Sequence, residues 1–376
     1  MAPDFFDRTL LQWSGYTILL AGFLLTLLFQ SMFYFRLLFR MKNPQVNRFR
    51  PISVLMNIRN EEERIEKLLL QLLQQDYPEF EVVVVDDFSE DATLTIIGVM
   101  AKKYPRLKFS SLRQETHFSE KMAMNLALKA ATYDWVVFVS PETEGVDAQF
   151  LQRLSEQASD SADISLNYLN YLPRPGFYNR LCRVERFYAF LSSAAYSRAG
   201  LPLFYQQSNV LFNKQLYFEV DGFRGKMNAH FAHLELVFNH LVHKKVETSA
   251  TSHARLSENA WLGKPEFTDL VRKRILLWRD LGLFRRLLLL MDGLSGVLLV
   301  AGFCWLLVTE IQNWIVFTLP VLFVWLIHLF MVKTLLNRLN ERKIFLSSLM
   351  YVFVSPVVSL YHWAKIYIHL QRNKWN

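Results

Sequence analysis

Three short clusters of polar and charged residues each follow an apolar run in the first 150 positions. They are Asn57 to Glu61, the pair Asp86-Asp87, and Ser140 to Glu144. Their carboxylates and amides offer hydrogen bonds to a polar ligand, although an isolated acid at such a place is often only a helix cap. The functional interpretation therefore depends on whether the fold brings the three clusters together.

The segments around these clusters predict alternating strands and helices. Residues 81–86 form a continuous β-branched run, which is typical of a strand buried in a parallel sheet. The expected strands are 52–56, 81–86, 109–112 and 135–139, with helices at 65–72 and 120–131 between them. This alternation predicts an α/β domain with a doubly wound, mostly parallel sheet. Ligands of such sheets bind at the carboxyl ends of the strands, where all three clusters fall.

A long apolar run near the beginning of the chain predicts a membrane anchor. Residues 14–38 are long enough, since about 20 apolar residues span the hydrocarbon core as a helix. A cleavable signal peptide is less consistent with the sequence, because the run is too long and its start is not basic. We expect an N-terminal transmembrane anchor over residues 1–45. Basic residues follow it and, by the positive-inside rule, place the next part in the cytoplasm: Arg36, Arg40, Lys42, Arg48 and Arg50.

Three further apolar runs, at about 287–308, 314–332 and 344–364, predict a C-terminal transmembrane region over residues 284–376. If all three span, the basic tail lies outside, against the positive-inside rule. Pro356 interrupts the last run, and a re-entrant or interfacial segment there would remove the conflict, so two or three spans remain open. Asp292 lies near a helix end, where we expect it to reach water rather than to serve a function.

The composition agrees with a membrane-anchored protein that carries one cytoplasmic domain, expected over residues 46–283. Hydrophobic residues make up 52% of the 376 residues and charged residues 20%. The formal net charge of +8 comes from basic residues beside apolar runs, which favours contact with anionic lipid rather than nucleic acid. The two cysteines have neither a disulfide framework nor a metal-binding spacing.

Several motifs, in order, resemble glycosyltransferase family 2. The segments that carry the resemblance are 52–62, 75–78, 85–93, Glu120-Lys-Met-Ala-Met-Asn125, Ser208 to Lys214 and 220–223. The resemblance covers roughly residues 50–280 and implies a GT-A-like fold. It also implies an inverting transfer of a sugar from a nucleotide-sugar donor to an acceptor hydroxyl.

The resemblance assigns the donor side of the site to residues of the first half of the domain. In the family, a carboxylate after the second strand accepts hydrogen bonds from the nucleobase and ribose, and Asp86 and Asp87 occupy that place. The implied donor-binding residues are Arg59, Asn60, Glu61, Asp86, Asp87, Lys121 and Asn125.

The metal-binding motif of the family is altered. The family ends its fourth strand with Asp-x-Asp, which binds Mg²⁺ or Mn²⁺ and so neutralises the leaving diphosphate. Here Ser140 and Glu142 stand at the two aspartate positions. Glu142 and Glu144 are the candidate ligands, and we expect divalent cation binding to be weakened.

The motif that carries the general base is altered as well. The family's Glu-Asp pair aligns with Ala232 and His233. An imidazole is a competent base near neutral pH, so His233 is the first candidate and Glu235 the second. The Gln-x-x-Arg-Trp motif of processive members is reduced to Trp278, which argues against a processive polymer synthase.

These observations leave three hypotheses. The first is an integral membrane enzyme of the cell or inner membrane, non-processive, that glycosylates a lipid or saccharide acceptor near the membrane. The second is a catalytically impaired relative that binds nucleotide or serves as a scaffold for protein partners in envelope polysaccharide assembly. The third is a domain that serves only as a module for interaction with membrane proteins.

Overall fold

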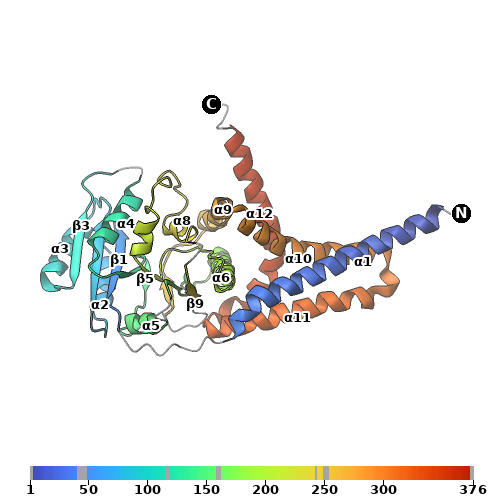
Figure 1. The fold of residues 1–376 in the computed structure, drawn as a ribbon. Helices are drawn as coiled ribbons and strands as arrows, with labels where there is room; N and C mark the ends of the chain where they lie inside the picture. The colour runs from blue at the N-terminus through green and yellow to red at the C-terminus, as the bar shows by residue number, and fades with distance from the viewer. Residues whose placement is uncertain are drawn as a thin grey trace.

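The computed structural model describes residues 3–39, 49–115, 118–157, 162–241, 244–248 and 254–372. Figure 1 shows an α/β domain beside a group of long helices that extends away from it. Arg40, Lys42 and Arg48, which contribute to the predicted orientation, lie outside the described residues.

The α/β domain is built on a seven-stranded sheet in the order β3-β2-β1-β4-β8-β6-β9. The strands are β1 (Ile52–Ile58), β2 (Phe80–Asp86), β3 (Leu107–Ser111), β4 (Trp135–Phe138), β6 (Ile164–Leu166), β8 (Val210–Asn213) and β9 (Val246–Thr248). The first four are parallel to one another, and β8 is antiparallel to both of its neighbours. The predicted doubly wound, mostly parallel sheet is therefore confirmed.

Both faces of the sheet are covered because successive strand residues enter two different cores. Val54 and Met56 of β1 pack in one core, whereas Leu55 packs in the other. The helices of this domain are α2 (Ile65–Leu73), α3 (Thr93–Lys103), α4 (Ser119–Ala130), α5 (Phe150–Gln157), α6 (Phe177–Arg198), α7 (Gln215–Glu219), α8 (Leu234–Phe238) and α9 (Lys264–Asp280), of which α9 packs on α6. This double coverage explains the continuous apolar strands of the sequence.

The strand register brings the polar clusters together at the carboxyl-end edge of the sheet. In β1 and β2, Ile58 lies opposite Asp86, and the Asp87 amide donates to the Ile58 carbonyl at 2.8 Å. A second, three-stranded sheet in the order β5-β10-β7 adds β5 (Thr143–Glu144), β7 (Leu169–Tyr171) and β10 (Leu256–Glu258). Through β5, it joins the segment after β4 to β10, which lies more than 100 residues later in the chain.

Four helices in the described residues are long and apolar enough to cross a membrane, over Trp13–Leu38, Leu283–Thr309, Ile311–Arg338 and Phe345–Ile368. They correspond to α1 (Pro3–Phe29) with its extension to Leu38, first a π-helical and then a 3₁₀-helical turn, and to α10 (Leu283–Thr309), α11 (Trp314–Arg338) and α12 (Phe345–Arg372). Asp292 of α10 does not simply face water as we expected. Its carboxylate accepts hydrogen bonds from Tyr34 at 3.0 Å and from Tyr196 at 2.8 Å.

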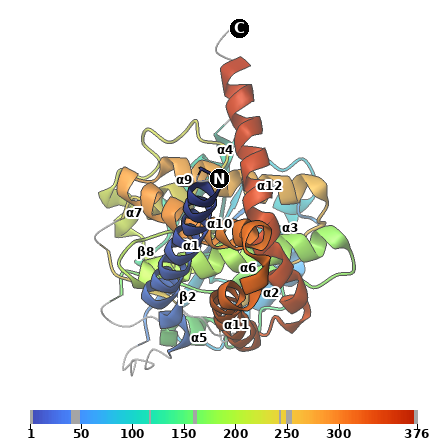
Figure 2. The ribbon, with the colours of Figure 1, turned by 90° about the vertical axis from the view of Figure 1, so that its right-hand side faces the viewer.

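The last helix has a different direction from the other three. Figures 1 and 2 show α1, α10 and α11 running alongside one another, whereas α12 crosses them near the α/β domain. The helix is continuous through Pro356, so the proline does not divide it. This orientation favours the interfacial alternative for the last apolar run over a further span.

Glycines allow α1 and α10 to approach each other closely. A Cβ on Gly302 would lie 2.5 Å from the Leu19 backbone nitrogen, and one on Gly22 would lie 2.3 Å from the Leu299 nitrogen. Backbone atoms cannot move aside as a side chain can, and close approach over small residues is a main source of helix association in membranes.

We expect Gly302→Val to destabilise the folded chain by about 1–3 kcal/mol, the usual cost of overpacking. The check is thermal unfolding in detergent, with Gly296→Val as control, because a Cβ on Gly296 of the same helix meets nothing within 4 Å. Equal losses in the two variants would show that the α1–α10 contact contributes no stability.

Candidate functional site

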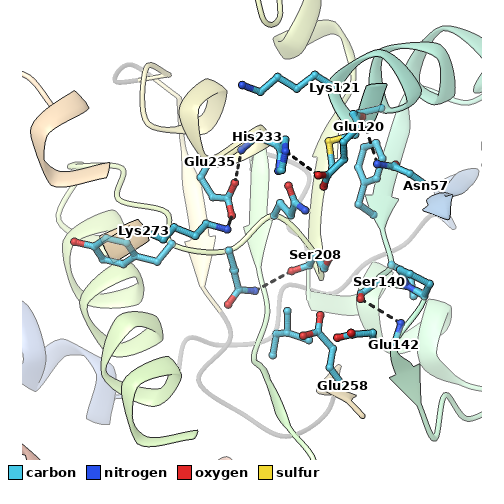
Figure 3. A pocket seen from close by; sticks show the side chains of 18 of the residues that line it. Asn57, Glu120, Lys121, Ser140, Glu142, Ser208, His233, Glu235, Glu258 and Lys273 are labelled. Carbon is cyan, nitrogen blue, oxygen red and sulfur yellow. Dashed lines mark hydrogen bonds and ion pairs between the residues drawn. The ribbon is translucent and has the colours of Figure 1, made fainter. Parts of the chain in front are cut away.

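A cavity of about 780 Å³ opens at the carboxyl ends of β1, β2 and β4. Residues from all three polar clusters line it, among them Arg59, Asp87 and Glu142. The opposite wall comes from α6, α9 and the segment around α8, and Figure 3 shows side chains from both sides directed into the same space.

Apart from Oε1 of Glu235, which is ion-paired with Lys273, three oxygen atoms on residues that line the cavity are buried without a hydrogen-bond partner in the described part of the chain. They are Oδ1 of Asn57, Oδ1 of Asp87 and Oε1 of Gln207. A buried acceptor without a donor costs about 1–3 kcal/mol. All three are acceptors, so the cavity suits a ligand that brings several hydroxyl or N–H donors.

The adjacent residues Asp86 and Asp87 have different positions, and only Asp87 lines the cavity. Asp87 accepts a hydrogen bond from the Ser119 hydroxyl at 3.0 Å, and burial raises the pKa of its carboxyl. Asp86, which the resemblance also implied to bind the donor, does not line the cavity. Its carboxylate instead fixes the following turn through the Ser89 amide at 3.2 Å and the Ser89 hydroxyl at 2.5 Å.

In the loop after β1, some residues line the cavity and another holds the loop in place. Arg59 and Glu61 line the cavity, and burial raises the pKa of Glu61. Arg59 is ion-paired with Glu115 at 2.6 Å. Asn60 lies outside the lining and ties this loop to the next one, since its Oδ1 accepts from the Glu90 amide at 2.9 Å.

The lysine expected to oppose phosphate charge is already engaged. Lys121 Nζ donates to the carbonyls of Lys226 at 2.7 Å, Met227 at 3.3 Å and Ala229 at 2.7 Å. These contacts use its three donors, and burial lowers the pKa of this lysine. Lys121 therefore holds the loop that precedes α8 rather than presenting its charge to a ligand. Asn125 lies further along α4 and outside the cavity lining.

The acids after β4 do not form a ready cation site. Glu144 does not line the cavity, and its carboxylate accepts a hydrogen bond from the Asn259 side chain at 2.5 Å. Glu142 does line it, next to the buried Glu258, and Figure 3 shows these two side chains together. Burial, and then the charge of Glu258, raises the pKa of Glu142.

A divalent cation would find few free ligands here. Glu258 is already paired with Arg186 at 2.5 Å, which leaves Glu142 as the one unpaired carboxylate of the two. No group of three or more His, Cys, Asp or Glu side chains within the described ranges could hold a metal ion. The residues around β4 thus do not fit the cation of the Asp-x-Asp motif, which requires hard oxygen ligands.

The candidate base lies on the opposite side of the cavity from Glu142. His233 Nε2 is 3.0 Å from Oε2 of Glu120, and the His233 backbone amide donates to Glu235 at 3.1 Å. The Glu235 side chain is fully buried and paired with Lys273 at 2.5 Å. Burial by itself raises the pKa of Glu235, but the Lys273 ammonium outweighs it and lowers the pKa overall.

Sequence reasoning missed several charged residues of this site, among them Glu120, Arg186, Glu258 and Lys273. Glu120 was visible as the residue before Lys121 in the helix-start motif. The other three come from α6, β10 and α9, where no local motif marks them.

Comparison with known proteins agrees with this architecture. Over 93% of this chain and 99% of the other, the fold is similar to the mannosyltransferase PcManGT from Pyrobaculum calidifontis in complex with GDP-Man and Mn²⁺. The TM-score is 0.55 and the sequence identity 17%. The likeness shows the fold, and the α/β domain is GT-A-like.

The sequence comparisons define the family of this domain. Residues 53–199 match the model described as Glycosyl transferase family 2, so the chain contains a family 2 glycosyltransferase domain. TarS of Staphylococcus aureus, a poly(ribitol-phosphate) beta-N-acetylglucosaminyltransferase, is 42% identical over 92 residues, 24% of this chain and 16% of TarS. The amylovoran biosynthesis glycosyltransferase AmsB of Erwinia amylovora is 33% identical over 103 residues, 27% of this chain and 34% of AmsB. The matched segment is thus a minor part of each relative.

Proposed function

We propose that this protein is a membrane-bound, non-processive glycosyltransferase. It transfers a sugar from a nucleotide-sugar donor to a hydroxyl of an acceptor near the membrane. The observation that carries the proposal is the set of unpartnered acceptor oxygens on Asn57, Asp87 and Gln207 around one cavity. The hydroxyl and N–H donors of a nucleoside and a sugar would satisfy them.

His233 is the general base in this proposal. With Nε2–H donated to Glu120, the lone pair of the neutral ring lies on Nδ1, which takes the acceptor proton. The acceptor oxygen then forms a bond to the anomeric carbon. The bond from that carbon to the diphosphate breaks, and the nucleoside diphosphate leaves with the electron pair, which inverts the configuration. Glu235 and Lys273 position the His233 segment.

The inner wall of the cavity supports an acceptor that arrives from the membrane. Glu185 and Arg274 line the cavity and also bond to α12. The Tyr351 hydroxyl donates to Glu185, and Arg274 donates to the Ser359 hydroxyl at 3.0 Å. We assign residues 1–45 to a membrane anchor, 46–283 to a cytoplasmic catalytic domain and 284–376 to a C-terminal membrane region.

We expect Asp87→Asn to weaken binding of UDP or GDP by about 10- to 100-fold. Hydrogen bonds to a charged group contribute about 1.5–3 kcal/mol, and 1.4 kcal/mol corresponds to a factor of ten. The check is isothermal titration calorimetry on the full chain in detergent. Asp134→Asn is the control, since Asp134 is exposed and outside the cavity lining.

The same preparation separates the hypotheses. Nucleotide binding with transfer to an added acceptor supports the enzyme. Binding without any transfer corresponds to the impaired relative that acts as a scaffold. A wild-type chain that binds neither nucleotide contradicts the proposed function.

A further inference from the structure

An arginine lies beside Glu142, at the part of the cavity where the family's Asp-x-Asp motif binds a divalent cation. Arg186 of α6 lines the cavity, and its charge acts on the neighbouring Glu142. Its Nη1 donates to Glu258 at 2.5 Å, and its guanidinium carbon lies 3.6 Å from the centre of the Tyr171 ring. Two contacts on different sides therefore fix the guanidinium in one orientation.

The remaining donors of this guanidinium are not used by the protein. A guanidinium has five N–H donors, and within the described part of the chain only the Nη1 bond to Glu258 engages them. The side chain is 21% exposed, and the cavity is what it faces. A planar fork with free donors at a cavity wall suits a phosphate group, which arginine binds through two parallel hydrogen bonds.

We propose that Arg186 binds the diphosphate of the nucleotide-sugar donor and takes the place of the divalent cation. The inference rests on the proposed function and adds that donor binding does not require a metal. It follows from two features of the same wall. The carboxylates there leave only Glu142 unpaired for a cation, and a positive group is already present beside them.

The role is consistent with the charge changes of the reaction. When the bond between the anomeric carbon and the diphosphate oxygen breaks, the electron pair remains on that oxygen. A fixed positive group at this position stabilises the developing charge without reorganisation. The proton released by the acceptor goes to His233, so no further reactant is required.

The effect of removing Glu142 distinguishes arginine from metal. If a cation bridges Glu142 and the diphosphate, Glu142→Gln abolishes nucleotide binding. If Arg186 binds the diphosphate directly, Glu142 is only a nearby negative charge, and Glu142→Gln leaves the affinity unchanged or increases it. The two mechanisms therefore predict opposite outcomes for one isosteric substitution.

The experiment measures UDP and GDP affinity of the full chain in detergent, once with EDTA and once with Mn²⁺. The nucleotide that binds wild type should do so within about threefold in both buffers. Arg186→Gln should lower that affinity by about 10- to 100-fold in both, since one charge-assisted contact contributes about 1.5–3 kcal/mol. Arg180→Gln should have no effect, because Arg180 is an exposed arginine of the same helix that does not line the cavity.

A second variant guards against a loss of folding. Arg186→Lys keeps the charge opposite Glu258 but not the planar fork, so we expect normal thermal stability with intermediate affinity. Binding that requires Mn²⁺ and disappears in Glu142→Gln overturns the inference and leaves the proposed function intact. Absence of nucleotide binding in both buffers overturns the proposed function itself.

Discussion

His233→Ala is expected to reduce sugar transfer by about 10²- to 10⁴-fold, the usual contribution of a positioned general base. Donor affinity should stay unchanged, because the unpartnered oxygens that suit the donor lie on other residues, such as Asp87. The imidazole lines the cavity, its side chain is 15% exposed, and its Nε2 lies 3.0 Å from Oε2 of Glu120. These features give it access to a substrate and a defined orientation.

The measurement is turnover of a radiolabelled sugar together with nucleotide affinity for the same preparation. Added imidazole should restore part of the activity of His233→Ala, which a purely structural defect would not allow. His240→Ala is the matched control, since His240 lies outside the cavity lining and its ring bonds to the Leu236 carbonyl. Full activity in His233→Ala, with activity lost in Glu235→Gln, would move the role to Glu235.

Glu120→Gln tests the orienting carboxylate. It should lower turnover less than His233→Ala does, because Glu120 acts through the histidine and is 51% exposed. An effect on donor affinity instead would mean that Glu120 belongs to the donor side of the cavity.

The sequence was sufficient for the four parallel strands of the sheet and for the edge at which the site lies, but not for β6, β8 and β9. Continuous β-branched strands, such as residues 81–86, occur where both faces are covered, and the two cores of this domain provide that cover. The parallel register then had to bring the ends of β1 and β2 together. The convergence of Arg59, Asp87 and Glu142 follows from those two facts.

The roles of individual side chains could not be predicted from the sequence. Asp86 and Asp87 are neighbours in sequence, yet only one lines the cavity, because direction at a strand end is set by the turn that follows. Lys121 is held by carbonyls more than 100 positions away. Arg186 and Lys273 each pair with an acid from another element, so no local pattern identifies them.

Glu341→Gln is expected to lower the free energy of unfolding by about 3–5 kcal/mol, the cost of breaking a buried ion pair by removal of one partner. The Glu341 side chain is 0% exposed and lies between α11 and α12. It pairs with Arg183 of α6 and, at 2.8 Å, with Arg255. Without its charge, the buried guanidinium of Arg183 loses its counter-ion at the contact between the α/β domain and the membrane helices.

Thermal unfolding in detergent tests this, with Arg224→Gln as control, because the Arg224–Asp221 pair is exposed on both sides and such pairs contribute about 0–1 kcal/mol. The double variant Glu341→Gln with Arg183→Met should recover much of the loss, since it removes the uncompensated charge as well. Glu341 does not line the cavity, so nucleotide affinity should be retained wherever the variant is folded. Equal stability of Glu341→Gln and Arg224→Gln would mean that apolar packing alone, and not this ion pair, holds α6 against the membrane helices.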